Sequence, residues 1–287
     1  MGEAPRQLKN TSPMQITKQD FERALPVGTS AHIEVFQQVQ PAIEGVATSY
    51  ASQLLGKEGN AMLADIHADN YLLQEYKRLV CLTAFRSVLR QIDLVLTPTG
   101  FGIVSSGGVA PAAKHRVDAL YYQLLDEEMK ARATVVFLLR SLSWGTTVQA
   151  TYALPYLYTA HRFFFVDSYN TRGANDWDNF QSAVWGTDAI MRNAMGDAQM
   201  DELLRCYRCK SLSPKHEPVV EGVCRLTVMY ADKGNGILKS PLYRQVMQLI
   251  DEDAETFSQY HQSVQFKANH HENFQNRKDS AGFLFNG

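Results

Sequence analysis

The chain has almost no net charge, because 28 lysine and arginine residues oppose 30 aspartate and glutamate residues for a balance of −2. Binding nucleic acid by bulk electrostatics requires a concentrated basic face, so the sequence argues against that mode, although DNA can still pass nearby. No apolar run approaches the ~18 residues of a membrane span. Residues Met1 to Arg6 carry neither a secretory signal nor a serine or threonine at the myristoylation position. We expect a soluble protein made in a cytoplasm, without a membrane partner.

Motifs for catalysis are missing as well. No two histidines form an i, i+4 pair with a carboxylate placed as in a zinc hydrolase, and there is no Gly-x-Ser-x-Gly elbow. The best histidine candidates are His67 beside Asp69 and the pair His270 and His271 beside Glu272, and both sets also fit a solvated surface. We therefore expect no catalytic residue, no metal and no cofactor.

Cysteine is scarce, with Cys81, Cys206, Cys209 and Cys224 as the full set. Cys206 and Cys209 have ligand-like spacing, but a second close pair is absent, so free thiols in a reducing compartment are expected. The acidic runs 126–128 and 251–253 resemble the carboxylates of a di-metal helical bundle. Since the accompanying Glu-x-x-His motif is missing, the plain interpretation is a solvated acidic face.

The most unusual stretch runs from Leu94 to Ala113 and contains no charged residue. Helix-to-helix connections longer than roughly 12–15 residues are usually functional or disordered, and disorder requires low hydrophobicity and high charge. The turn at Pro98, Thr99 and Gly100 predicts a hairpin or an ordered Ω-loop. A phosphate-binding loop is disfavoured because the third glycine and a Gly-Lys-Ser/Thr sequence are absent. The apolar residues either fold back onto their own domain or are buried against another subunit, and the candidate interface residues are Phe101, Ile103, Val104 and Val109.

Hydrophobic periodicity predicts a mainly α fold. Thr17 and Asp20 form a possible capping box for a short helix that Pro26 ends. In the next helix, Pro41 is a possible break and Gly56 a stop signal. The four helices expected in the first half are 17–25, 33–55, 71–92 and 111–142. Residues 146–152 and 162–166 are rich in β-branched and aromatic side chains, which predicts two short strands or an extended linker before helices resume near Asp176.

Short sequence matches suggest an internal duplication. Phe36-Gln37 and Leu82-Thr83 reappear 144 positions later at 180–181 and 226–227, and 123–128 resembles 248–253 at a displacement of 125. The second half then carries the short connection 233–239 where the first half has its long apolar one. Paired helices are expected at 218–232 and 240–262, with Ser240 as N-cap and Pro241 as the first helical residue.

These patterns divide the chain into two duplicated helical-bundle domains joined by a short β or extended, aromatic-rich segment. The expected boundaries are a flexible arm at 1–16, a helical domain at 17–142 with the loop 94–113, a linker at 143–175, a second helical domain at 176–263 and a C-terminal arm at 264–287. The arm closes on an apolar cluster. We expect Phe283, Leu284 and Phe285 to dock on a neighbouring subunit or on the portal protein, or alternatively to pack on their own second domain.

Two stretches carry a family resemblance. Residues 40–50 with Leu54-Leu55-Gly56 resemble the opening of helical head–tail connector proteins of tailed phages. Residues 96–102 through 110–117, with Pro98-Thr99-Gly100-Phe101-Gly102 as the specific part, resemble uncharacterised proteins encoded by phages and prophages of gut Bacteroidetes. The resemblance covers roughly residues 15 to 140.

The resemblance implies a virion structural protein, assembled in the bacterial cytoplasm. It would form a homo-oligomeric ring as an adaptor between the portal protein and the tail and neck proteins, with DNA passing through the channel. Two alternatives remain open from the sequence: a helical metal-dependent hydrolase acting on nucleotides or cell wall, and a phage-encoded interaction protein outside the virion.

Overall fold

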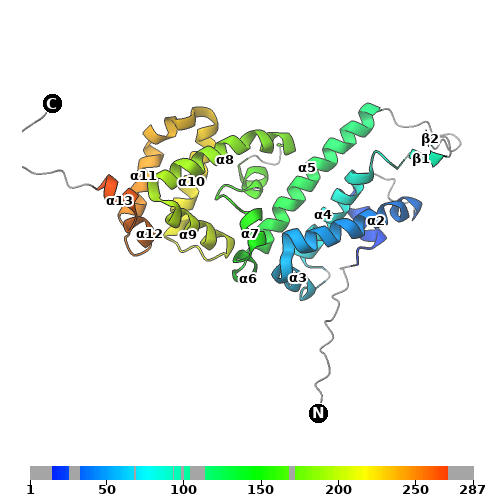
Figure 1. The fold of residues 1–287 in the computed structure, drawn as a ribbon, viewed down its shortest axis with the longest axis horizontal. Helices are drawn as coiled ribbons and strands as arrows, with labels where there is room; N and C mark the ends of the chain where they lie inside the picture. Colours follow the sequence, from blue (N-terminus) through cyan, green and yellow to red (C-terminus); the bar gives the residue numbers. More distant parts are fainter. Residues whose placement is uncertain are drawn as a thin grey trace, which may run out of the picture.

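The computed structural model describes residues 15–25, 33–67, 69–92, 94–97, 100–103, 114–167 and 172–270. This part of the chain is mainly α-helical, as predicted. Figure 1 shows an elongated molecule in which two groups of helices lie side by side along the long axis, with helix α5 running between them. Each group has its own apolar core. We call them the first bundle, α1 to α7, and the second bundle, α8 to α13 with the turn that precedes α8.

The first bundle opens with a helix that its own sequence caps. The side chain of Thr17 accepts a hydrogen bond from the Asp20 backbone amide at 3.2 Å, and Asp20 Oδ2 accepts one from the Thr17 amide at 2.9 Å. This confirms the predicted capping box, which satisfies two backbone donors that the first helical turn leaves free. The elements that follow are α1 (Lys18–Ala24), α2 (Ile33–Tyr50), a π-turn at Ala51–Leu55, α3 (Gly56–Ala64), α4 (Tyr71–Val88) and α5 (Lys114–Leu139).

Of the two expected helix breaks, the structure contains the one at Gly56 and not the one at Pro41. Pro41 lies inside an uninterrupted α2. A proline clashes with the carbonyl four residues earlier, and here both Pro41 and Gln37 are exposed, so that carbonyl can tilt toward water. Gly56 is the C-cap at which the helical stretch from Ile33 to Leu55 ends, as expected, and its φ is 62°. This positive φ, which glycine adopts readily, turns the chain, and α3 begins directly at the same residue.

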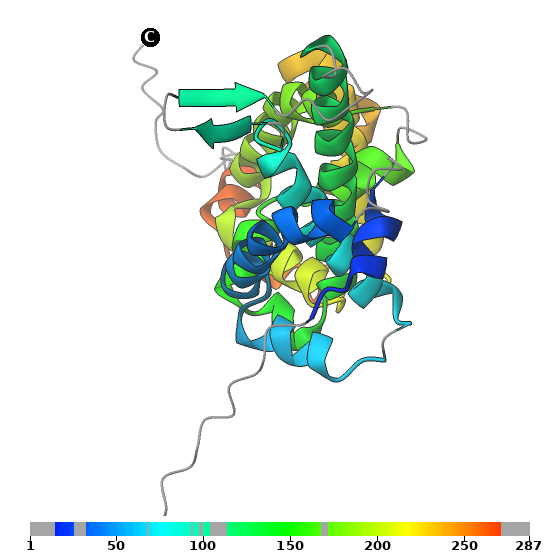
Figure 2. The ribbon, with the colours of Figure 1, turned by 90° about the vertical axis from the view of Figure 1, so that its right-hand side faces the viewer.

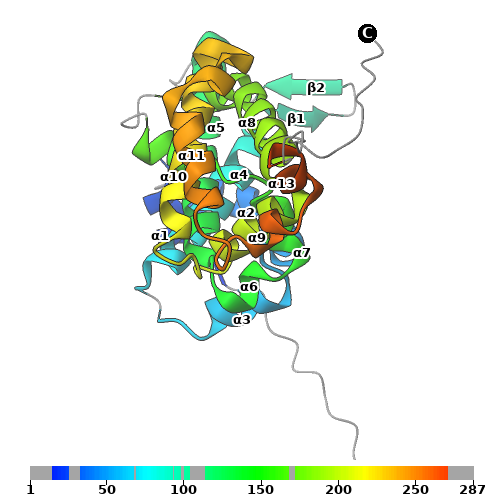
Figure 3. The same ribbon diagram turned by 90° about the vertical axis from the view of Figure 1, so that its left-hand side faces the viewer.

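The apolar connection forms a hairpin, one of its two predicted forms. Strand β1 (Leu94–Thr97) pairs antiparallel with β2 (Gly100–Ile103), with Leu94 opposite Ile103 and Thr97 opposite Gly100. Figures 2 and 3 show the hairpin extending sideways from the helices. Phe101 and Ile103 lie on β2. Val104, Val109, Phe283, Leu284 and Phe285 lie outside the described residues.

The predicted strands at 146–152 and 162–166 are wrong, because both segments are helical. The structure has α6 (Leu142–Gly145), α7 (Val148–Ala153) and a π-turn at Arg162–Val166. Thr147 is the N-cap of α7, and its hydroxyl accepts a hydrogen bond from the Ala150 amide at 3.2 Å. A capping hydroxyl thus outweighs the β-propensity of the threonines. Trp144 is buried in the first core and Phe163 in the second, so this segment is packed structure and no extended linker.

The second bundle consists of α8 (Ala174–Met195), α9 (Asp197–Arg208), α10 (His216–Lys233), a 3₁₀ turn (Gly234–Lys239), α11 (Pro241–Asp251), α12 (Ser258–His261) and α13 (Val264–Asn269). Ser240 caps α11 and Pro241 is its first residue, as predicted, although α11 ends at Asp251 and not near Gln262. α13 lies at the end of the molecule away from the hairpin (Figure 1). Its Phe266 packs edge-on against Tyr260 with ring centroids 5.3 Å apart, so the second bundle continues past the expected boundary at 263.

Helix α5 contributes to both cores. Leu124, Val135 and Leu139 are buried in the first core, while Ala133 is buried in the second. Because α5 has apolar side chains on more than one side, each of these sides must be covered by other helices. This explains the position of α5 between the two cores. In the described residues, no helix combines the length and the apolar character needed to cross a membrane.

Candidate functional site

The acidic run on α5 is not the solvated face that we expected. Arg86 on α4 holds Glu128 with its Nε 2.6 Å from Oε2, and it also donates to the hydroxyl of Tyr121 at 2.9 Å. Glu128 is only 8% exposed. Arg78, which lies on α4 eight positions before Arg86, pairs with Glu127. Because the arginines of α4 meet the carboxylates of α5 along their contact, these acids hold two helices together.

The third carboxylate of this run joins the two bundles. Asp126 Oδ1 accepts a hydrogen bond from the backbone amide of Ala174, the first residue of α8, at 2.7 Å. A Cβ atom at Gly173 would come within 2.7 Å of the same oxygen, so glycine is needed for this approach. A carboxylate at a helix N-terminus satisfies a free donor and favours the positive end of the helix dipole. Asp126 therefore has a structural partner.

The cysteine and histidine candidates are not gathered into a site. All four thiols are buried and free, and burial raises the pKa of Cys81 and of Cys224 to about 12, which leaves them poor nucleophiles. His67 is exposed, and His270 Nε2 lies 3.5 Å from Asp251 Oδ1 at the surface. His271 and Glu272 lie outside the described residues. Within the described ranges, no three histidine, cysteine or acidic residues are grouped so that they could hold a metal ion.

A candidate site lies where the two bundles meet. A cavity of about 270 Å³ is bounded by α5, by the segment from α7 to His161 and by α8 and α9. Apolar and aromatic side chains dominate its lining, which consists of Met129, Arg132, Ala133, Val136, Phe137, Tyr152, Ala153, Leu154, Pro155, Tyr156, Tyr158, Thr159, Ala160, His161, Trp177, Asp178, Gln181 and Tyr207. Sequence reasoning missed it because the lining comes from four segments, one of which we had expected to be a strand.

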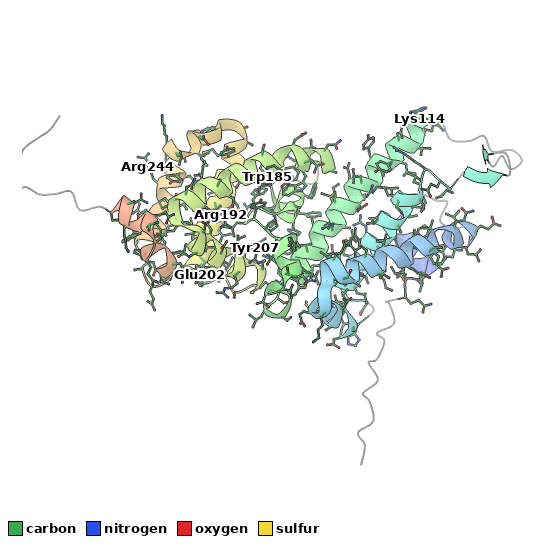
Figure 4. The ribbon with its side chains drawn as sticks, viewed as in Figure 1. Lys114, Trp185, Arg192, Glu202, Tyr207 and Arg244 are labelled. Atoms are coloured by element: carbon green, nitrogen blue, oxygen red, sulfur yellow. The ribbon has the colours of Figure 1, made fainter. Side chains whose placement is uncertain are left out.

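Stacked rings form one wall of this cavity. The rings of His161 and Phe137 are parallel within 7° with centroids 3.8 Å apart. Just after the end of α5, the guanidinium carbon of Arg140 lies 4.1 Å from the Phe137 ring centroid and 4.3 Å from that of Tyr207. Figure 4 labels Tyr207 on α9, in the middle of the molecule. Arginine between two aromatic faces is a cation–π arrangement, so this stack ties the second bundle to the first.

His161 should make the fold acid-sensitive. Burial, followed by the nearby charge of Arg140, lowers the pKa of His161 from 6.5 to about 4. A lowered folded-state pKa means that the unfolded chain takes up the proton first, so His161 contributes stability that is complete above pH 6.5 and is lost as the pH falls toward 4. Allowing for its partial exposure, we expect about 2 kcal/mol lost across that window.

Replacing His161 by phenylalanine preserves the ring that stacks on Phe137 and removes the titration. Urea unfolding at pH 7 and at pH 4.5 should therefore show a smaller loss of unfolding free energy in His161→Phe than in the unchanged chain. His67→Phe, at an exposed histidine, is the matched control and should leave the pH dependence as it is. Equal pH dependence in His161→Phe and in the unchanged chain would refute the assignment.

Comparison with known proteins adds one match. The model of a family of unknown function, DUF6712, matches residues 35–160, from the start of α2 past the end of α7. No curated protein and no solved structure matches the chain. The matched region contains the hairpin and most of the first bundle, and it includes much of the cavity wall but not the lining residues of α8 and α9.

Proposed function

We propose that the chain is a structural subunit of a tailed-phage virion, a head–tail connector that forms a homo-oligomeric ring between the portal and the tail. In this proposal DNA passes through the ring without sequence-specific contacts, and the subunit carries no catalytic residue and no cofactor. The ring is assembled in the cytoplasm of the host bacterium. The resemblance of the stretch around Pro98–Gly102 to phage-encoded proteins is the source of the virion assignment.

The hairpin is the observation that carries the ring. Its strongest contacts are between its own two strands, and it extends away from the helices in Figures 2 and 3. The connection that contains it has no charged residue over 94–113. A charge-free segment of this length favours burial, and we propose that another subunit provides the cover. A contact between two different surfaces of the same chain gives a ring when the rotation between neighbouring copies closes.

The proposal also includes the duplication of the bundle. Each half contains six helices in the same order. A long helix, a shorter one and a second long helix come first. A connection, a fourth helix and two short helices follow. This order is α2, α3, α4, α5, α6, α7 in the first half and α8, α9, α10, α11, α12, α13 in the second. The hairpin of the first half corresponds in order to the 3₁₀ turn Gly234–Lys239 of the second. If the bundle is a repeated scaffold, the hairpin is what distinguishes the first copy.

Two pairs of local contacts support the duplication. The hydroxyl of Thr83 donates to the carbonyl of Leu79 at 2.9 Å, and that of Thr227 donates to the carbonyl of Val223 at 3.0 Å. Both threonines belong to the repeated Leu-Thr dipeptide and both lie on the second long helix of their half. The same back-bond therefore recurs at a displacement of 144 positions, although other helical threonines such as Thr134 also make it.

The second pair of contacts involves two glycines with positive φ. Gly56 (62°) begins α3, and Gly196 (88°) precedes α9. A Cβ at Gly56 would meet the side chain of Gln149, and one at Gly196 would meet that of Gln265. Each glutamine lies on the last short helix of its half. The match of 123–128 to 248–253 joins α5 to the shorter α11, and the two segments begin nine (123 − 114) and seven (248 − 241) positions after the first residue of their helices.

The ring is tested by charging the hairpin. Phe101→Asp with Ile103→Asp should convert the oligomer into a folded monomer, because two carboxylates would have to be buried without partners in the contact. Native mass spectrometry measures the assembly, with and without the portal protein, and thermal melting measures the fold. We expect loss of the ring with an unchanged melting temperature.

The matched control places the same charges in the second half, one on α10 and one in the 3₁₀ turn that corresponds in order to the hairpin. Val228 and Leu238 are 38% and 45% exposed, and Val228→Asp with Leu238→Asp should leave the ring intact. An unchanged oligomer after the hairpin substitutions, or an unsubstituted chain that is monomeric throughout, contradicts the ring. Recovery of the chain from intact particles separates a virion subunit from an interaction protein that stays outside the virion.

A further inference from the structure

The size of the cavity between the bundles limits what can occupy it. Small-molecule sites usually measure about 300–1,000 Å³, whereas a cavity of about 150 Å³ is enough to bind benzene. At about 270 Å³, this cavity lies at the lower end of the small-molecule range. It has room for one or two aromatic side chains.

The chemistry of the lining favours the same kind of occupant. Rings from four elements face the space, among them Phe137, Tyr156, His161 and Trp177. The charged lining residues, Arg132 and Asp178, are both exposed, so the interior offers little to a charged ligand. Aromatic side chains gain from edge-to-face and offset contacts with such walls beyond the area that they bury. At the edge of the cavity, Tyr152 is 80% exposed and has no cover within the described residues.

The chain itself contains a matching segment. Phe283, Leu284 and Phe285 are consecutive, and this is the one place outside the described residues where two aromatics flank a leucine. Phe283 follows His270 by 13 positions (283 − 270), and a chain of that length can span at most about 45 Å. The segment departs from α13, at one end of the molecule, whereas the cavity lies at the junction of the bundles (Figure 1).

We propose that this cavity is the docking pocket for the Phe283–Phe285 segment of a second copy of the chain. The inference rests on the proposed ring and deepens it. A subunit with a pocket at one place and an anchor at another makes a heterologous contact, which is the kind that closes into a ring. Phe283 and Phe285 fill the pocket, and Tyr152 closes over them.

A synthetic peptide of residues 280–287 tests the pocket directly. It is added to the full chain carrying Phe283→Ala and Phe285→Ala, so that the pocket is free, and binding is followed by fluorescence anisotropy. Ala153→Trp and Ala160→Phe each narrow the cavity from a partly exposed wall, and each should weaken the peptide about 30-fold, as expected for loss of a buried anchor. Ala189→Trp, at an exposed position of α8 outside the lining, should leave binding unchanged.

Disulfide trapping identifies the source of the occupant and does not depend on the cavity-narrowing variants. The full chain with Tyr152→Cys and Phe285→Cys has two accessible thiols, because the four natural ones are buried. Under mild oxidation we expect covalent multimers on a non-reducing gel. A cross-linked monomer would mean that the segment occupies its own chain's pocket, and no cross-link would mean that it does not reach the pocket. Either result overturns the proposal.

The two measurements separate this inference from the ring. A ring that persists while the peptide shows no saturable binding, or binds the narrowed and control variants equally, refutes the pocket and leaves the hairpin contact standing. Peptide binding and covalent multimers from a chain that shows no closed oligomer by native mass spectrometry uphold the pocket and refute the ring.

Discussion

Replacing Trp144 by alanine is expected to lower the free energy of unfolding by about 4 kcal/mol. Trp144 is fully buried in the first core, and its indole Nε1 donates to the carbonyl of Leu54 at 3.1 Å. The substitution removes the largest fully buried side chain and leaves that carbonyl without its donor, so a cavity cost and a hydrogen-bond cost combine. Urea unfolding monitored by circular dichroism measures the loss.

Trp185 supplies the matched control for this experiment. It lies on α8, is 55% exposed, and is labelled in Figure 4. Trp185→Ala should change the unfolding free energy by less than about 1 kcal/mol, because little of the side chain leaves water on folding. Similar losses for the two variants would mean that Trp144 is not packed as described, and that residues 143–175 behave as the linker that the sequence predicts.

Replacing Arg86 by alanine should cost about 3 kcal/mol, the second-largest effect that we expect. The side chains of Arg86 and Glu128 are 20% and 11% exposed, and the pair is bidentate, with nitrogen–oxygen distances of 2.6 and 3.2 Å. Removing the arginine leaves a buried carboxylate without its counter-charge, which is far more costly than removing both partners. Chemical denaturation of Arg86→Ala measures the loss.

Two further variants define what this loss means. Arg86→Met with Glu128→Met removes both charges and should recover most of the stability, since an apolar pair of similar size avoids the desolvation cost. Arg90 pairs with Asp118 but is 60% exposed, so Arg90→Ala should cost less than about 1 kcal/mol. If Arg86→Ala costs no more than Arg90→Ala, the α4–α5 contact does not depend on the ion pair.

Local signals in the sequence were sufficient for several elements. Thr17 with Asp20 predicted the capped start of α1, and Ser240 with Pro241 predicted the start of α11, because in both cases the capping atoms lie within three residues of the amides that they satisfy. The turn at 98–100 predicted a hairpin or an Ω-loop, and β1 and β2 pair as a hairpin. The mainly helical fold follows from hydrophobic periodicity, which needs no knowledge of what the helices pack against.

Tertiary structure decided the rest. The aromatic residues of 162–166 have β-propensity, yet the segment is a π-turn because Phe163 and Phe164 are both buried in the second bundle. The sequence shows that residues 126–128 are acidic. Only the tertiary structure shows that they bind the arginines of α4 and the first turn of α8, and so connect these helices to α5. Nothing near Glu128 in sequence specifies Arg86, which is 42 positions away.

The cavity shows the same division most clearly. Its aromatic residues can be read from the sequence. Phe137, Trp177 and Tyr207 line the same cavity only because α5, α8 and α9 pack around the segment that follows α7. The sequence by itself determined the long helices of both bundles and the position of the charge-free connection between α4 and α5, because caps, turns and periodicity act over a few residues. The tertiary structure alone decided which charges are buried as pairs and where the bundles leave a pocket, because both depend on contacts between residues far apart along the chain.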